Sequence, residues 1–214
     1  MTKESYIRFM APVVAETTDQ LLQIVDSKIR EKYQRLHLML SSPGGSVFHG
    51  LAIYNFLRGV PLEIYTYNFG TVDSIGVVIF SAGVRRFSVP HSRFLIHGVR
   101  FNISGNVSFD EKQVEEHLKS LQIDQENIAR VIADTTGKPL HKIQEDMNNR
   151  ATLNPTQAKD YGLVHEIKSE LLPADAEFAV IRELIQRPQQ ILAQVTAPLI
   201  QAYTQPTDLD VGTV

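Results

Sequence analysis

The sequence predicts an α/β protein with a largely parallel sheet. Two observations favour this class: strand-like and helical signals alternate along the chain, and three apolar runs end in corners that carry glycine or polar side chains. The corners are Ser-Pro-Gly-Gly-Ser at 42–46, Gly-Thr-Val-Asp-Ser-Ile-Gly at 70–76 and Phe-Leu-Ile-His-Gly at 94–98. Because the order strand, corner, helix repeats, we expect these corners to gather at one end of the sheet.

The elements of the first half follow from the spacing of its apolar residues. Short apolar runs or alternation predict strands at 6–10, 36–40, 62–69 and 94–97. Apolar residues at helical spacing predict helices at 17–32, 47–57 and 74–82. The glycines of the first corner directly precede the second of these helices.

The second half is predicted to be mainly helical. The polar stretch 102–108 is typical of an exposed hairpin or loop, and Asp110 suits the N-cap of a long helix that runs to about Asp134. Pro139 suits the start of the next helix, and residues 157–164 predict a helical turn that ends at a glycine and leads into a strand. The long helix should turn six apolar residues inward: Val114, Leu118, Leu121, Ile128, Val131 and Ile132.

The chain divides into a domain over 1–167 and a C-terminal extension over 168–214. The extension is predicted to be helical from about Ala174 to Ala202, with interruptions at Pro188 and Pro198, and its last dozen residues have the composition of a disordered end. We expect this extension to be an appendage of the domain.

Composition excludes several classes of function. The formal net charge of −3 gives no reason to expect nucleic acid as a partner. The absence of cysteine excludes disulfides, a thiol nucleophile and cysteine-ligated zinc, and is compatible with the cytoplasm, where we expect the protein. The polar start and the short apolar runs predict neither a secretory signal nor a membrane span. No metal or cofactor is expected.

The three corners carry groups that suit acyl transfer. Gly44 and Gly45 leave backbone N–H groups accessible, Ser74 lies at a strand-to-helix corner, and His97 ends an apolar strand. Each also has a structural interpretation: a tight turn for the glycines, a helix cap for Ser74 and a core histidine for His97.

Five motifs occur in an order that is more specific than any one of them. They extend over roughly Tyr6 to Ile167: Ser42-Pro43-Gly44-Gly45-Ser46 with Gly50-Leu51-Ala52-Ile53-Tyr54, Gly70-x-x-x-Ser74-Ile75-Gly76, Ser81-Ala82-Gly83, Arg86-Phe87-Ser88-Val89-Pro90-x-Ser92-Arg93-Phe94-Leu95-Ile96-His97 and Ala158-x-x-Tyr161-Gly162-Leu163-Val164. This series resembles the proteolytic subunit of the Clp protease. The resemblance implies a crotonase-type β-α-β superhelical fold and a serine endopeptidase that cuts peptides or unfolded proteins. It also implies a homo-oligomer of stacked heptameric rings around a chamber.

The resemblance also assigns roles to individual residues. It implies that Ser74 is the nucleophile, that His97 is its general base, and that the amides of Gly45 and Ile75 form the oxyanion hole. Residues 100–135 correspond to a protruding handle that joins the rings. Tyr6 aligns with the first core strand, so the family's axial gating segment has no counterpart and an unfolding ATPase as partner is doubtful.

Two positions depart from the family pattern. Arg150 aligns with the catalytic aspartate, and an arginine cannot accept the histidine N–H. Asp146, one helical turn earlier, is the tentative third catalytic residue, and Asn148 or Asn149 are weaker alternatives. A serine–histidine pair oriented by a backbone carbonyl or a water is a further alternative. Asp73 replaces a small residue beside Ser74, where its carboxylate could raise the basicity of His97 or hinder anionic intermediates.

Four hypotheses about the function therefore stay open at the level of sequence. The first is an active serine endopeptidase, which the retention of both Ser74 and His97 favours. The second is a ring or scaffold subunit with impaired catalysis, which Arg150 and Asp73 favour. A lysine-assisted dyad like that of signal peptide peptidase A and a crotonase-like acyl-CoA enzyme are further alternatives.

Overall fold

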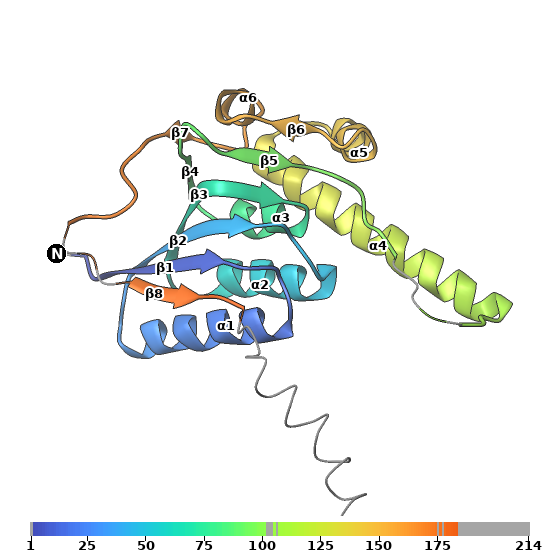
Figure 1. Ribbon diagram of the computed structural model, residues 1–214, viewed down its shortest axis with the longest axis horizontal. Coiled ribbons are helices and arrows are strands. Elements are labelled where there is room, and N and C mark those ends of the chain that lie inside the picture. The colour runs from blue at the N-terminus through green and yellow to red at the C-terminus, as the bar shows by residue number, and fades with distance from the viewer. Residues whose placement is uncertain (1, 102–104, 106, 175, 177, 184–214) are drawn as a thin grey trace, which may run out of the picture. The chain divides into compact units, whose positions relative to one another are not determined.

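The protein folds around one mostly parallel sheet that is flanked by helices (Figure 1). The computed structural model describes residues 2–101, 105, 107–174, 176 and 178–183. Within these residues the predicted mixed α/β fold with a mainly parallel sheet is confirmed. The predicted helices over 184–202 and the predicted disordered end lie outside the described residues, as does most of the expected loop at 102–108.

The sheet has eight strands among the described residues, and seven of them run parallel to a neighbour. The central order is β6-β5-β3-β2-β1-β8, and β4 pairs with both β3 and β7. The strands are β1 (Glu4–Met10), β2 (Arg35–Ser42), β3 (Glu63–Asp73), β4 (Arg85–Ser88), β5 (Arg93–Leu95), β6 (Thr152–Leu153), β7 (Glu166–Ile167) and β8 (Phe178–Ile181). The pair β5–β6 is antiparallel. Sequence pattern does not predict the short β4, because two arginines open it.

Three helices, α1 to α3, cover one face of the sheet, and α4 crosses its end (Figure 1). The helices are α1 (Ala15–Arg30), α2 (Val47–Gly59), α3 (Ile75–Ser81), α4 (Glu111–Thr136), α5 (Leu140–Asn148) and α6 (Pro155–Asp160). The main core lies between this helical layer and the sheet, where Leu36, Leu38 and Leu40 of β2 are fully buried. A strand of a parallel sheet is covered on both faces, which explains the nearly continuous apolar run of β2.

The residues after β7 stay with this fold. Phe178–Ile181 forms β8, which pairs with β1, so the helix predicted from Ala174 is wrong over this segment. Without β8 the outer edge of β1 would carry unpaired backbone groups, and the β-branched Val180 and Ile181 suit a strand that satisfies them. On the sheet face away from α1 to α3, Leu171 and Leu172 pack against a small aromatic cluster around Tyr67 and Phe87.

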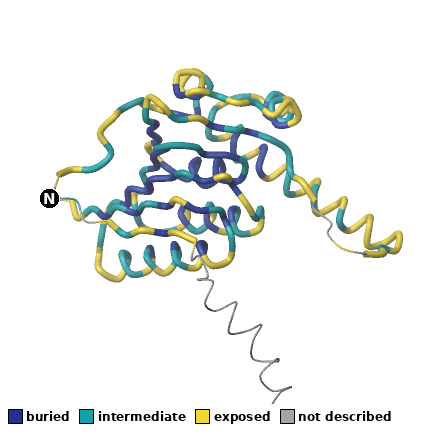
Figure 2. The backbone as a smooth tube through the Cα atoms, in the orientation of Figure 1, coloured by how far each residue is buried: buried dark blue, intermediate teal, exposed yellow. Residues whose placement is uncertain are grey.

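Only part of α4 buries the apolar residues that are expected to face inward. Ile128 and Ile132 are buried, as the helical spacing predicts, but Val114 is 53% and Leu118 55% exposed. Figure 2 shows why: the N-terminal half of α4 runs beyond the sheet, and its surface is largely exposed. Periodicity identifies an apolar face correctly, but it does not say whether the same chain supplies the partner.

Arg86 joins the C-terminal segments to the sheet. Its buried guanidinium donates to the carbonyls of Leu163 at 2.7 Å and Gly83 at 3.1 Å, and it also reaches the carbonyls of Thr135 and Gly162 at 3.3 Å. A rigid fork with five N–H donors can satisfy several carbonyls at once. One side chain on β4 therefore holds the end of α4 and the segment after α6 together.

We predict that Arg86→Met lowers the free energy of unfolding by about 2–4 kcal/mol, because it leaves buried carbonyls without donors. Chemical denaturation monitored by circular dichroism measures this change. The matched control is Arg85→Met, since Arg85 is half exposed and its ion pair with Glu166 spans 3.8 Å. Exposed pairs contribute less than about 1 kcal/mol. Equal losses in the two variants would contradict the role given to Arg86.

Candidate active site

Ser74 lies at a sharp corner between β3 and α3. Its backbone has φ 58° and ψ −129°, a positive-φ conformation that residues other than glycine rarely adopt. The Ser74 N–H donates to the Leu95 carbonyl at 2.8 Å, which ties the corner to β5. Although Ser74 is the N-cap residue of α3, its side chain makes no capping hydrogen bond. The hydroxyl is therefore not used to cap the helix.

The Gly44-Gly45 turn packs directly against this corner. Gly44 has φ +89° and Gly45 φ +149°, and a Cβ added to Gly44 would lie 2.6 Å from the Cβ of Ser74. On the other side, the Gly44 carbonyl accepts from the N–H of Val13 at 2.8 Å, and a Cβ on Gly45 would collide with the Val13 carbonyl. The turn requires glycine because backbone from two strands meets there without room for side chains.

Two backbone donors near Ser74 have no partner in the described chain. Among the backbone hydrogen bonds of the described residues, none uses the N–H of Gly45 or of Ile75. Ile75 is the first residue of α3, where an N–H lacks an intrahelical acceptor. Both N–H groups are therefore free to donate to another acceptor.

His97 follows β5 and is fixed by backbone on both sides. Ile96 N–H donates to the Ala151 carbonyl at 2.8 Å, and Gly98 N–H donates to the Met147 carbonyl at 3.1 Å. The imidazole Nδ1 lies 2.7 Å from the Gly98 carbonyl oxygen. A carbonyl oxygen can only accept, so Nδ1 carries the proton and Nε2 of the neutral ring keeps its lone pair.

One pocket of about 180 Å³ brings these groups together. Ser74, His97, Gly45 and Ile75 all line it, although they come from three separate corners of the chain. The rest of the wall is formed by Val47, Gly98, Val99, Arg100 and Ile128. The sequence predicts that the corners meet at one end of the sheet, and in the structure they do.

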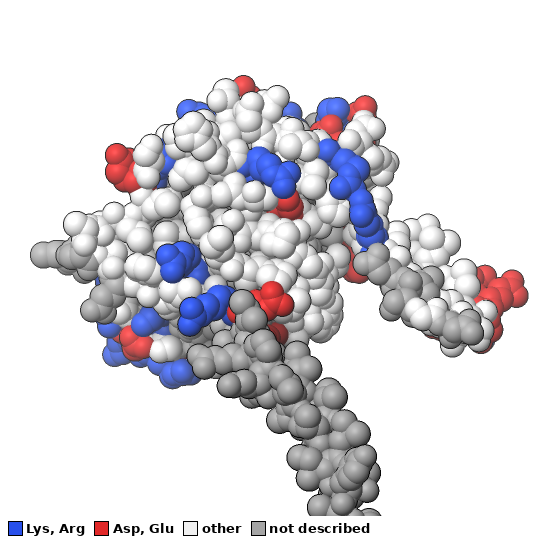
Figure 3. Space-filling view, viewed as in Figure 1, with Lys and Arg blue, Asp and Glu red and all other residues white. Residues whose placement is uncertain are grey.

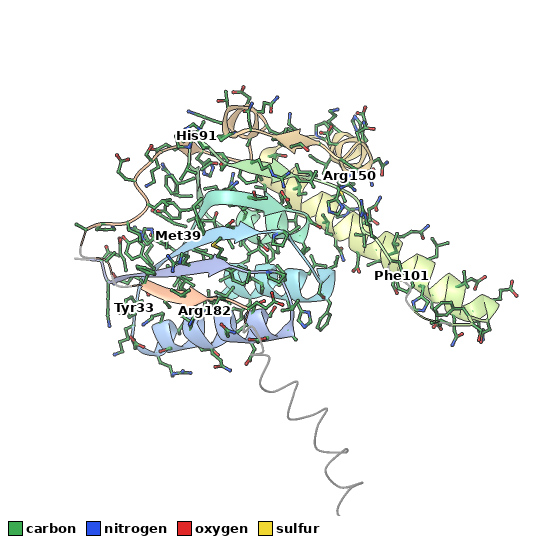
Figure 4. The ribbon with its side chains drawn as sticks, in the orientation of Figure 1. Tyr33, Met39, His91, Phe101, Arg150 and Arg182 are labelled. Atoms are coloured by element: carbon green, nitrogen blue, oxygen red, sulfur yellow. The ribbon has the colours of Figure 1, made fainter. Side chains whose placement is uncertain are left out.

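In the structure no hydrogen bond or ion pair joins Asp146, the tentative third catalytic residue, to His97. Its Oδ2 accepts from the hydroxyl of Tyr161 at 2.7 Å, and its Oδ1 pairs with Lys142 at 3.0 Å. Burial raises the pKa of Tyr161, so its hydroxyl remains a donor. The Tyr161 hydrogen bond links α5 to the end of α6, whereas the Lys142 ion pair lies within α5. Arg150, which Figure 4 labels beside α5, is exposed and has φ 57°.

Asp73 is the carboxylate that lies beside the pocket. Its Oδ2 pairs with the guanidinium of Arg93 at 2.8 Å, whereas its Oδ1 is buried without a hydrogen-bond partner. Burial raises the pKa of the Asp73 carboxyl, while the charges of Arg93 and His97 act in the opposite direction.

Sequence reasoning misses the partners that lie far along the chain. Ile128 is assigned an inward position, but nothing indicates that this part of α4 forms a wall of the pocket. Arg93 belongs to one of the five motifs, yet the motif does not identify Asp73 as its partner. The parallel register of β3 and β5, in which Thr71 aligns with Arg93 and Asp73 with Leu95, is the signal that would show it.

The described part of the chain contains neither a metal-binding cluster nor a membrane-spanning helix. No group of three or more histidine, aspartate or glutamate side chains there is arranged to hold a metal ion. No helix among the same residues is long and apolar enough to cross a membrane.

Comparison with known proteins identifies the family. The sequence model of the Clp protease family matches residues 1–170. A proteolytic subunit of the ATP-dependent Clp protease from Bdellovibrio bacteriovorus is 29% identical over 170 residues, which cover 78% of this chain and 80% of that protein. The fold resembles that of an asparagine-to-aspartate mutant of ClpP1 from Listeria monocytogenes, with a TM-score of 0.69 and 24% identity over 79% of this chain and 92% of the other. The chain therefore belongs to the Clp protease family.

Proposed function

We propose that this protein is a serine endopeptidase that hydrolyses peptides or unfolded protein chains, with Ser74 as nucleophile and His97 as general base. One observation carries the proposal: Ser74, His97, Gly45 and Ile75 all line a single pocket, and no backbone hydrogen bond uses the N–H of Gly45 or Ile75 in the described chain. Membership of the Clp protease family supports it.

The first step is proton transfer from Ser74 to Nε2 of His97. The Gly98 carbonyl on Nδ1 selects the tautomer in which Nε2 is the base. Ser74 and His97 are not hydrogen-bonded to each other in this structure, and such contacts commonly tighten when substrate binds. The serine oxygen then attacks the scissile carbonyl carbon, and the N–H groups of Gly45 and Ile75 stabilise the oxyanion.

The second step releases the amine. The imidazolium of His97 donates its new proton to the leaving nitrogen, the C–N bond breaks, and Ser74 is left as an ester. Water then repeats the sequence: His97 takes its proton, the hydroxide attacks the ester, and Ser74 leaves with the proton returned. The Gly98 carbonyl supplies a dipole to Nδ1 in place of the usual carboxylate.

A catalytically impaired ring or scaffold subunit is the second candidate. Arg150 at the aligned aspartate position favours it, as does the engagement of Asp146 by Tyr161 and Lys142. A lysine-assisted dyad receives no support, since no lysine lines the pocket among the described residues. The reactivity of Ser74 separates the two candidates.

We also propose that the protein assembles into stacked heptameric rings through the handle at residues 100–135, most of which forms α4. Mostly apolar side chains of this handle surround a hollow of about 220 Å³, and three of them, Phe101, Val114 and Leu118, are exposed. The other lining residues are Phe109, His117 and Leu121. Figure 4 places Phe101 alongside α4, and Figure 3 shows acidic side chains at the end of α4 that begins at Glu111. An apolar patch with a charged rim is typical of a protein interface.

The decisive test of activity is covalent labelling of Ser74 by a fluorophosphonate probe. We expect labelling of the wild-type protein between about pH 6 and 9 and none of Ser74→Ala, because only an activated serine reacts. Mass spectrometry of the labelled peptide identifies the site. Ser169→Ala, at an exposed serine outside the pocket, should label like the wild type. A wild-type protein that is unlabelled throughout this range is the scaffold subunit.

Gly44→Ala should slow the labelling of Ser74 by about 100-fold, because its methyl group would displace the serine from its working position. The rate of labelling and the thermal midpoint are measured together. Gly59→Ala is the control, since a Cβ there meets nothing within 4 Å. Unchanged labelling of a folded Gly44→Ala protein contradicts the close approach of the turn to Ser74.

The double variant Val114→Glu/Leu118→Glu should dissociate the assembly, because two buried carboxylates are unfavourable in an apolar interface. Multi-angle light scattering measures the mass. Glu115→Lys, at an exposed polar position of the same helix, should keep the wild-type mass. A wild-type monomer would rule out the chamber.

A further inference from the structure

Asp73 immediately precedes Ser74 in the chain. It lies on the same side of the sheet as the part of β5 that continues to His97. Asp73 aligns with Leu95 in the parallel pairing of β3 and β5, and Thr71 aligns with Arg93. Because aligned residues and residues two apart share a face, Asp73 lies between Arg93 on one side and the continuation of β5 towards His97 on the other. The carboxylate interacts electrostatically with both.

The two oxygens of Asp73 have different surroundings. Oδ2 is held by Arg93, whose own side chain is 49% exposed, while the Asp73 side chain is only 10% exposed. Oδ1 is buried and accepts no hydrogen bond. A buried carboxylate oxygen without a donor is unfavourable for folding, and such groups often serve a function instead.

The candidate site lacks the negative charge that a serine–histidine pair normally has. Nδ1 of His97 faces a neutral carbonyl, Asp146 is engaged by Tyr161 and Lys142, and an arginine stands at position 150. When His97 takes the proton of Ser74, it becomes a cation in a partly buried pocket. A nearby carboxylate stabilises that cation, and it can do so through space because the field of a charge extends over several ångströms.

We infer that Asp73, held in place by Arg93, is a positioning residue that supplies the negative charge for the His97 imidazolium. The inference rests on the proposed peptidase function. In the usual triad a carboxylate bonds Nδ1; here the Gly98 carbonyl sets the tautomer and Asp73 supplies the charge. The two tasks of one aspartate are thus divided between two groups.

Other charges around the pair act against the imidazolium. Arg93 belongs to β5, and Arg100 follows β5 and lines the same pocket. The α4 residue that lines the pocket, Ile128, is apolar. Arg150 lies in the connection between α5 and β6 and is exposed. Because Arg93 and Arg100 disfavour a further positive charge, Asp73 is the group that stabilises the protonated His97. The simpler alternative is that Asp73 and Arg93 only link β3 to β5.

The test is the pH dependence of fluorophosphonate labelling in Asp73→Asn and Arg93→Met. Removing the carboxylate should slow labelling on the plateau roughly tenfold or more and move the acid limb of the profile about half to one pH unit lower. Removing the arginine takes away a positive charge, so the acid limb of the Arg93→Met profile should move to higher pH. Shifts in opposite directions support the inference. A mere link between strands predicts no shift in either variant, and unshifted or parallel profiles overturn it.

A second measurement keeps this test separate from that of the proposed function. Diethyl pyrocarbonate modifies the neutral imidazole, and the rate at His97 can be followed by mass spectrometry in a Ser74→Ala background that needs no catalysis. The midpoint of this rate against pH should fall with Asp73→Asn and rise with Arg93→Met. His141, an exposed histidine on α5, is the internal control and should not move. An unlabelled wild type refutes the peptidase, whereas an unshifted His97 midpoint refutes the role of Asp73.

Discussion

The candidate site depends on the close approach of backbone at Gly44 and Gly45. The end of β2 meets the segment after β1 through Val13, and on its other side it touches Ser74 at the end of β3. Any side chain at these positions would push the segments apart. The Ser74 corner and the free N–H of Gly45 are thus placed by the same turn. The Ser74 corner has a conformational free-energy cost, because Ser74 adopts a positive φ that the surrounding contacts must enforce.

A second set of contacts fixes the histidine. His97 is held through its neighbours Ile96 and Gly98, which bond to carbonyls of α5 and of the segment that follows it. That region is kept in place by Asp146, and the residues after α6 are held to the sheet by Arg86. Asp146 therefore contributes to the site through its hydrogen bond with Tyr161, and no hydrogen bond joins its carboxylate to the imidazole. Asp146, which lies near the expected catalytic position, thus helps to hold the segment that fixes His97.

Local patterns in the sequence are sufficient for β1, β2, β3 and β5 and for the meeting of the three corners. Strand ends in a parallel sheet converge, so Ser74, His97 and the glycine turn can be placed together from the order of their motifs. The partners of Asp73 and Asp146 depend on tertiary geometry: Arg93 and Tyr161 are 20 and 15 residues away. Likewise, the exposure of Leu118 and the strand at Phe178–Ile181 reflect which surfaces remain uncovered. The periodicity of apolar residues does not indicate which surfaces the rest of the chain covers.

The pairing of β8 with β1 has a consequence for how copies of the chain can meet. A parallel sheet with a bare outer strand is a template on which further chains can add by backbone hydrogen bonding, which leads to open-ended polymers. Here residues from the same chain occupy the outer side of β1. β8 then forms the edge itself, and its four residues offer a shorter row of backbone groups than the seven of β1. A short edge strand leaves another chain few backbone groups to pair with, so β8 limits the addition of further strands at this edge.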